Sequence, residues 1–251
     1  MGTNFENEVK LFMVFDILGD TVRSGPKLWL IERERLEDVK NHIFDLLLIF
    51  RIIEKHLPET INKEKVFDYI LCHDLPEAIT GDITKFEGVS QEEIDRVTKI
   101  AIDYLALKFN NVMDFRSILE RYEDKADIEA KVVSLIDKVH SATTFVKYAF
   151  ERKIDVDDPR IIPELAPYVN MVKEQGIDLG DLFYQYHSSR LNITDDECQK
   201  YNISRECADK ILSVIKGFVD EFYKQKMNGT LLDVTNTFPS DAIKYKRDKN
   251  K

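Results

Sequence analysis

The residues with the most chemical potential lie in one short segment, His73-Asp74-Leu75-Pro76-Glu77, which is followed by Gly81-Asp82. If this segment is helical, Glu77 lies one turn from both His73 and Asp74, so an imidazole and two carboxylates converge on one patch. Such a trio can bind a metal ion and orient a water. A solvent-facing helix surface explains an isolated His-Asp pair more simply, so other residues must decide between the two interpretations.

Two further polar residues fall within apolar stripes of the sequence. His42 lies on an otherwise apolar face, where a buried imidazole costs free energy unless a hydrogen bond or a metal satisfies it. Asp137 follows Leu135 and Ile136, and a buried carboxylate must be paired or coordinate a cation. Two nitrogens and two carboxylates would leave open positions on an octahedral ion for water and substrate. The candidate ligands are His42, His73, Asp74 and Asp137.

Helices must position these residues, because apolar side chains recur mostly at intervals of three and four. Pro58 and Gly81 mark helix ends, and Ser90 with Glu93 has the spacing of a capping box at a helix start. From about residue 155 to 202, prolines and glycines break the pattern into short pieces. The sequence therefore predicts an all-α fold, with apolar stripes over residues 5–17, 36–57, 66–78, 94–105, 128–150 and 207–222.

Composition excludes several classes of protein. The chain has 251 residues with a net charge of −10, so its far field repels nucleic acid and anionic membrane surfaces. It has no apolar run of about 20 residues and no basic leader, so we expect a cytoplasmic protein with no membrane partner. The odd cysteine count without CxxC spacing argues against disulfides, and we expect reduced, buried thiols at Cys72, Cys198 and Cys207.

In its candidate ligands His42, His73, Asp74 and Asp137, the sequence resembles the HD-domain phosphohydrolases. The match is closer to the 5′-deoxynucleotidase branch, because residues 73–83 look like its HD-x-x-E-x-x-x-G-D segment. Residues 122–138 resemble the region around that branch's final aspartate. The resemblance covers about residues 21–151, and it implies an HD-domain helical core over residues 1–152. Residues 153–251 are then a C-terminal helical extension that ends in a basic, disordered tail.

The resemblance also implies a role for each matching residue. His42, His73, Asp74 and Asp137 would hold one divalent transition metal ion (Mn, Co, Fe, Ni or Zn), and Glu77 would orient or deprotonate the attacking water. Asp82 would face the sugar and assist catalysis. Arg23 would meet the phosphate, Trp29 would exclude a ribose 2′-hydroxyl, and Lys85 is a further candidate for phosphate contact. The chain departs from the family in that residues 24–28 separate Arg23 from Trp29, and in carrying Asn41, Ile43 and Asp45 around His42.

The resemblance leads to an expected reaction with two alternatives. It implies a metal-dependent enzyme that removes the 5′-phosphate from deoxyribonucleoside monophosphates, with a mononuclear site because no histidine lies between Asp74 and Asp137. A deoxynucleoside triphosphate triphosphohydrolase and a non-catalytic, metal-binding regulatory module remain the alternatives. The apolar C-terminal helix could either form a homodimer or close the core. His140 could be either a partner of the site or a surface residue. His187 and Arg190 could belong either to a loop that contacts phosphate or to a plain polar loop.

Overall fold

A computed structural model describes residues 5–31, 36–151 and 154–227, and within these ranges it contains no β-strand. The predicted all-α fold is confirmed. In the same ranges one isolated β-bridge is present, between Val22 and Asp38, just ahead of α3. The α-helices are α1 (Glu6–Ile17), α2 (Ser24–Leu28), α3 (Val39–Ile53), α4 (Lys63–Cys72), α5 (Glu77–Thr80), α6 (Gln91–Phe109), α7 (Phe115–Glu123), α8 (Ile128–Phe150), α9 (Ala166–Gln175), α10 (Leu179–Ser188), α11 (Asp195–Tyr201) and α12 (Arg205–Met227); the 3-10 helices are η1 (Glu54–His56), η2 (Lys85–Glu87) and η3 (Pro163–Leu165).

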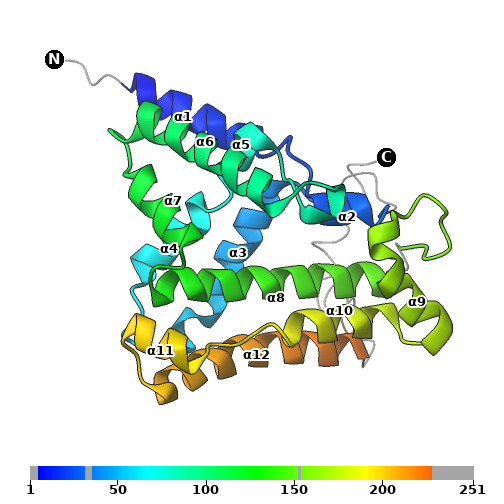
Figure 1. Ribbon diagram of the computed structural model, residues 1–251. Coiled ribbons are helices and arrows are strands. Elements are labelled where there is room, and N and C mark those ends of the chain that lie inside the picture. Colours follow the sequence, from blue (N-terminus) through cyan, green and yellow to red (C-terminus); the bar gives the residue numbers. More distant parts are fainter. Residues whose placement is uncertain (1–4, 32–35, 152–153, 228–251) are drawn as a thin grey trace, which may run out of the picture.

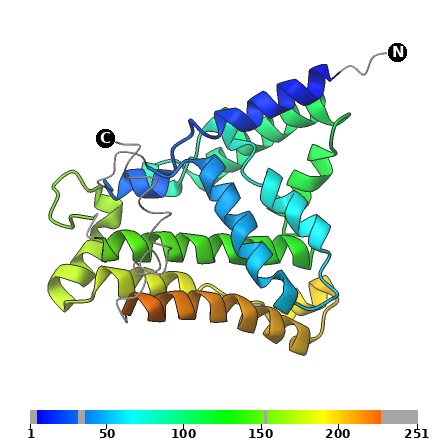
Figure 2. The same cartoon turned by 180° about the vertical axis from the view of Figure 1, so that it is seen from behind.

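The long helix α8 runs through the middle of the molecule (Figure 1). It begins where Asp127 accepts a hydrogen bond from the Ala130 N–H, the arrangement of a helix N-cap. Its apolar residues cover more than one face, because α3, α4, α10 and α12 all pack against it. The view from behind shows α3 crossing α8 on one side, with α10 and α12 along its length (Figure 2). Side chains on α8 can therefore meet residues from four other helices.

One hydrophobic core joins the first and last parts of the chain. Leu135 and Ile136 of α8 are fully buried together with Leu46 of α3. Ile211 and Ile215 of α12 belong to the same buried cluster. The C-terminal helices thus help to exclude water from α8, and the division of the chain at residue 152 stays a prediction.

The predicted helix over residues 66–78 is interrupted. Helix α4 ends at Cys72, residues 73–76 form a turn, and α5 begins at Glu77. Pro76 has no N–H to donate to the Cys72 carbonyl, which instead accepts from the Leu75 N–H at 2.9 Å. His73 and Asp74 therefore lie at a helix end rather than within a regular helix. Gly81 ends α5 with φ +74°, as the sequence predicts.

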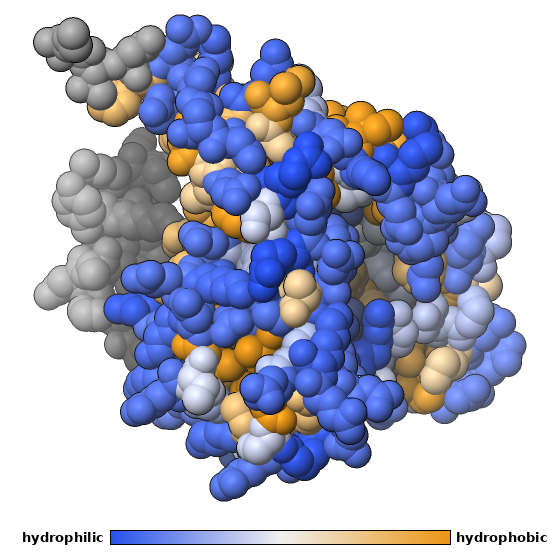
Figure 3. Space-filling model, turned by 60° about the vertical axis from the view of Figure 1, so that its left-hand side comes forward, coloured by the Kyte–Doolittle hydropathy of each residue, from blue (hydrophilic) through white to orange (hydrophobic). Residues whose placement is uncertain are grey.

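Two details at the surface differ from the sequence predictions. Ser90 caps α6 by accepting from the Glu93 N–H, but the Glu93 carboxylate pairs with Arg96 instead of closing the capping box. Helix α1 forms, yet its apolar stripe is exposed, and Leu11 is the buried residue of this helix. Figure 3 shows one side of the molecule as mainly hydrophilic with separate apolar patches. None of the described helices is both long and apolar enough to cross a bilayer.

Candidate active site

The four predicted metal ligands converge from three parts of the fold. His42 lies in the first turn of α3, His73 and Asp74 follow α4, and Asp137 lies in the middle of α8. Nε2 of His42 is 3.4 Å from Asp74 Oδ2 and 3.4 Å from Asp137 Oδ1. Nε2 of His73 is 3.3 Å from Asp74 Oδ1. The structure therefore brings all four side chains together around His42.

The two imidazoles each have a buried nitrogen that lacks a hydrogen bond. Nε2 of His42 and Nε2 of His73 are both buried and have no hydrogen-bond partner among the described residues. Nδ1 of His73 lies 2.9 Å from the Ile70 carbonyl oxygen and donates to it, so Nε2 carries the lone pair. Burial, with the charges of Arg23, His140 and His73, lowers the pKa of His42 well below its usual value. Neutral imidazoles with free Nε2 lone pairs are the form that binds a metal.

His140 contacts His42 through Nδ1, the ring nitrogen that does not face Asp74 and Asp137. Its Nδ1 lies 3.0 Å from Nδ1 of His42, and one of these two nitrogens must donate to the other. Nε2 of His140 lies 3.3 Å from Asp45 Oδ2 and 3.4 Å from Glu37 Oε1. If His42 presents its Nε2 lone pair to a cation, its Nδ1–H donates to His140, and the Nε2–H of His140 is directed to these carboxylates. Each of the four ring nitrogens of His42 and His140 then has one role as a donor or an acceptor.

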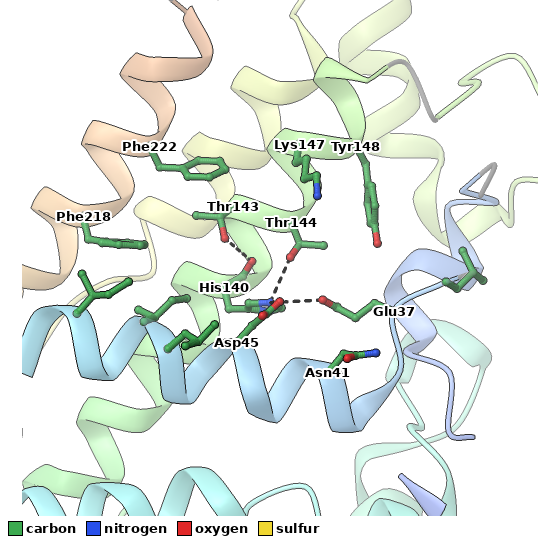
Figure 4. A pocket seen from close by; sticks show the side chains of 14 residues that line it. Glu37, Asn41, Asp45, His140, Thr143, Thr144, Lys147, Tyr148, Phe218 and Phe222 are labelled. Atoms are coloured by element: carbon green, nitrogen blue, oxygen red, sulfur yellow. Dashed lines mark hydrogen bonds and ion pairs between the residues drawn. The ribbon is translucent and has the colours of Figure 1, made fainter. Parts of the chain in front are cut away.

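A pocket of about 560 Å³ opens on the far side of His140. Figure 4 shows Asp45 and Glu37 approaching His140 from the α3 side, while Thr143 and Thr144 come from α8 and two aromatic rings come from α12. The His140 imidazole lies between this pocket and His42, and it is itself 3 % exposed. His140 is therefore buried and contacts the candidate cluster, which decides against a surface role.

Arg23 and Asp82 form the edge of the cluster. The guanidinium of Arg23 lies 3.3 Å from Asp74 Oδ2 and 3.8 Å from Asp82 Oδ2. Burial opposes this charge, but the nearby carboxylates, Asp74 foremost, outweigh it and raise the pKa of Arg23 above its usual value. Asp82 also accepts from the Ser24 N–H at 2.7 Å, which fixes its carboxylate at the start of α2. A permanent cation thus lies beside the residues that would hold a metal.

Glu77 has the environment of a proton acceptor held out of bulk water. Its Oε2 is buried and has no hydrogen-bond partner among the described residues. Burial, together with the negative charges of Asp74 and Asp82, raises the pKa of Glu77 well above its usual value, with Arg23 opposing. A pocket of about 590 Å³ exposes Glu77 next to His73 and Asp74. A carboxylate with a raised pKa in a cleft is typical of acid-base catalysis.

The other predicted substrate residues are divided between two locations. Arg23 is the N-cap residue of α2 and Trp29 is its C-cap residue, so the short helix between them spans about 9 Å. Both line one pocket with Asp82, which accounts for their separation in the sequence. Lys85 does not line this pocket, although its exposed ammonium lies 5.4 Å from the centre of the ring of Phe86, which does. The structure does not bring Lys85 to the cluster.

Sequence reasoning missed several residues that the fold places here. Ser24 contacts Asp82 and Glu37 contacts His140, although their positions in the sequence do not predict these contacts. Asp45, which the sequence places one turn beyond His42, contacts His140. The aromatic residues of α8 and α10 beside Arg23 were also missed. A signal existed on α8, because Ser141 and Phe145 follow Asp137 at successive intervals of four residues and so share its face.

The donor set fits a divalent ion. Ligand atoms of His42, His73 and Asp74 lie within 4.8 Å of one another, and Asp137 adds a second carboxylate beside His42. Two imidazole nitrogens with two carboxylate oxygens suit divalent transition metals better than Ca²⁺ or Mg²⁺, which prefer oxygen alone. The unpartnered Nε2 atoms are satisfied if they bind an ion there.

Comparison with known proteins identifies the family of this chain. An HD domain family model matches residues 16–157, more than half of the chain, and the chain belongs to this family. It is 26 % identical over 141 residues to the 5′-deoxynucleotidase HDDC2 of Xenopus laevis, and 30 % identical over 145 residues to the 5′-deoxynucleotidase hdd1 of Schizosaccharomyces pombe; each match covers 55 % of this chain and 69 % of the relative.

Among solved structures, a conserved hypothetical protein from Pyrococcus furiosus shares the fold with a TM-score of 0.50 and 19 % sequence identity. This match covers 66 % of the present chain and 99 % of the Pyrococcus chain. At this identity the likeness concerns the fold alone.

Proposed function

We propose that this protein is a metal-dependent phosphohydrolase that removes the 5′-phosphate from deoxyribonucleoside monophosphates. The observation that carries the proposal is the pair of buried, unpartnered Nε2 atoms of His42 and His73 beside Asp74 and Asp137. Relatives named as 5′-deoxynucleotidases are 26 % and 30 % identical to this chain over 141 and 145 residues. In this proposal the four residues hold one ion of Mn, Fe, Co, Ni or Zn.

The remaining residues then divide the chemical work. When bound, the dication polarises a phosphoryl oxygen and lowers the pKa of a nearby water. Glu77 accepts the proton of the attacking water at its buried Oε2, and the positive charge of the ion favours the ionised carboxylate that this step needs. As the water oxygen bonds to phosphorus, the bond from phosphorus to the 5′-oxygen breaks, that oxygen takes up a proton from solvent, and Glu77 returns to solvent the proton that it accepted.

Arg23 and Asp82 are suited to hold the substrate. The Arg23 guanidinium keeps its charge at any physiological pH and can bind a phosphate through two N–H groups. Asp82 is anchored by the Ser24 N–H and contributes to catalysis by holding the deoxyribose in place. Trp29 lies in the same pocket and is placed to exclude a 2′-hydroxyl from the sugar site.

Two alternatives are outcomes of the same experiment. A triphosphohydrolase needs several cations along a polyphosphate. Among the described residues, the arginine that contacts Asp74 and Asp82 is Arg23. A regulatory module with a structural metal has no use for the buried, unpartnered carboxylate oxygen of Glu77. The first observation favours a monophosphate substrate, and the second favours a catalytic role over a structural one.

The test uses the full chain stripped of metal by a chelator and then supplied with one divalent ion at a time. Phosphate release is measured with deoxyribonucleoside and ribonucleoside 5′-monophosphates. We expect release that depends on added metal and is faster with the deoxy substrates. Release in the continued presence of chelator, or equal rates with both sugars, contradicts the proposal. Inorganic tripolyphosphate from a triphosphate substrate identifies the triphosphohydrolase, and no product with any metal identifies the regulatory module.

A further inference from the structure

An aromatic pocket of about 200 Å³ lies beside Arg23 and Asp82. Its walls come from α2, α8 and α10, from residues 82–86, and from Leu165 and Tyr168 at the start of α9. Helices α2, α9 and α10 gather near the C-terminal end of α8 (Figure 1). Residues 165–187 of this wall lie outside the part of the chain that matches the HD domain model. The rings that line it include Trp29, Phe86, Phe145, Tyr168, Phe183 and His187.

This pocket continues directly from the candidate metal cluster. On α8, Asp137, Ser141 and Phe145 are spaced by four residues each, so they lie in a row about 6 Å apart along the helix. Asp137 contacts His42, while Ser141 and Phe145 line the pocket. Arg23 connects the two sites on the opposite wall, because it contacts Asp74 and also lines the pocket. One molecule could therefore occupy both.

The rings are arranged to receive a flat, apolar group. Phe145 and Phe183 lie 4.8 Å apart between ring centres, and Trp29 stands edge-on to Phe183 at 5.2 Å. The His187 ring is nearly parallel to Phe145, with 10° between their planes. Gly25 lets α2 approach this wall, because a Cβ there would lie 3.0 Å from Phe145. Faces of aromatic rings are the surfaces on which nucleobases stack.

His187 offers a hydrogen bond that the protein does not use. Its Nδ1 is buried and has no hydrogen-bond partner among the described residues. Burial and the charges of Arg190 and Lys138 lower the pKa of His187 to about 4, so the ring is neutral at pH 7. A neutral imidazole has one donor and one acceptor nitrogen. A buried polar atom without a partner is costly unless a ligand or water satisfies it.

The larger cleft beside Glu77 is less suited to a nucleotide. Its lining includes six carboxylates against one lysine, Lys99, and such a surface repels a phosphate dianion. The aromatic pocket instead carries the Arg23 cation at its edge. The six acidic residues of the larger cleft are Asp74, Glu77, Asp95, Glu120, Glu123 and Asp124.

We propose that the aromatic pocket is a nucleobase subsite in which Phe145 and Phe183 contact the face of the base and His187 hydrogen-bonds to its edge. The inference rests on the proposed function, since it places the phosphate of the same molecule at the metal cluster. It assigns recognition of the base to α10, which lies beyond the HD domain match. His187 is then a specificity-determining residue rather than part of a phosphate-binding loop.

The first test measures binding without catalysis and needs no variant. Trp29 is the single tryptophan of the chain and lies in the pocket wall, so its fluorescence reports on occupancy. Deoxynucleosides, which lack phosphate, are titrated into chelator-treated protein. We expect a saturable change in Trp29 emission with deoxynucleosides that is larger than any change with 2-deoxyribose 5-phosphate, which lacks a base. The absence of any response to all deoxynucleosides overturns the proposal.

The second test separates base recognition from hydrolysis. In His187→Ala we expect KM for deoxynucleoside monophosphates to rise about three- to tenfold, the loss expected for one hydrogen bond. Hydrolysis of 2-deoxyribose 5-phosphate should be unchanged. His187→Asn, which keeps a polar group in less space, guards against a folding defect, and circular dichroism checks both variants. Gln185→Ala is the matched control, because Gln185 is exposed on the same helix.

The two tests also separate this inference from the proposed function. Hydrolysis of deoxynucleotides with an unchanged KM in both His187 variants keeps the enzyme and overturns the role of His187. A Trp29 response to deoxynucleosides in a protein that hydrolyses nothing keeps the subsite and overturns the enzyme.

Discussion

Nδ1 of His42 lies 3.0 Å from Nδ1 of His140, and both rings are buried at the contact between α3 and α8. This contact links the candidate metal cluster to the carboxylates of Asp45 and Glu37. Hydrogen bonds of this kind set which nitrogen of a ligating histidine is free to bind metal, and removing them commonly costs 10- to 100-fold in metal affinity.

We therefore expect His140→Phe to weaken metal binding by about tenfold or more, since Phe fills the space but cannot accept from His42. His140→Gln should recover part of the affinity, because its side-chain oxygen can accept that hydrogen bond. Metal affinity is measured by competition with a coloured chelator. His56→Phe is the control, as His56 is exposed at the end of η1. Equal affinities in His140→Phe and the unaltered protein would show that His140 has no such role.

Glu77→Gln tests the proposed proton acceptor. The amide cannot take a proton from water, so we expect kcat for deoxynucleotide hydrolysis to fall by about 10²- to 10⁴-fold. Metal content should remain, because Glu77 is outside the proposed ligand set. Elemental analysis and steady-state rates are measured on the same preparation. Glu92→Gln, on the exposed first turn of α6, should leave both quantities unchanged. Loss of the metal itself in Glu77→Gln would instead make Glu77 a ligand.

Gly81 ends α5 with φ +74°, immediately before Asp82. An alanine at this dihedral angle is strained, so Gly81→Ala should lower the free energy of unfolding by about 1 kcal/mol. Gly217 gives the opposite expectation, because it lies within α12 and a Cβ there meets nothing within 4 Å. Gly217→Ala should raise stability by about 0.5–1 kcal/mol. Urea unfolding curves check both, and a neutral or stabilising Gly81→Ala would contradict the expected strain.

Asp127 supports α8 through its charge. Burial opposes ionisation of Asp127, but hydrogen bonds from Lys65, the Ala130 N–H, Tyr69 and Arg121 prevail and lower its pKa to about 2. This folded-state pKa is below the value of about 3.9 in an unfolded chain. The stabilisation is therefore complete above about pH 4 and is lost as the pH falls toward 2.

Asp127→Asn should accordingly destabilise the protein by about 1–2 kcal/mol at pH 7, because Asn retains the cap but not the charge. The difference from the unaltered protein should shrink as the pH falls from about 4 to 2. Thermal unfolding over a series of pH values gives this comparison. Lys65→Met removes one of the ion-pair partners and should show a smaller effect of the same sign. A difference independent of pH would exclude the charge as its cause.

The sequence alone determined the secondary structure class and the chemical inventory of the site. Apolar intervals of three and four residues require helices in water, since only a helix gathers such positions on one face. Polar residues within apolar stripes, such as His42 and Asp137, carry an energetic cost that points to a ligand or partner. These are local properties, and no knowledge of the fold is needed to read them.

The tertiary structure decided which partners meet. The contact of His42 with His140 depends on how α3 crosses α8, and the aromatic pocket depends on α10 packing along α8. The exposed stripe of α1 shows the same limit, because a periodic pattern fixes a helix but not the surface it faces. Contacts between residues far apart in sequence arise from packing of whole helices, and the spacing within a single helix carries no record of them.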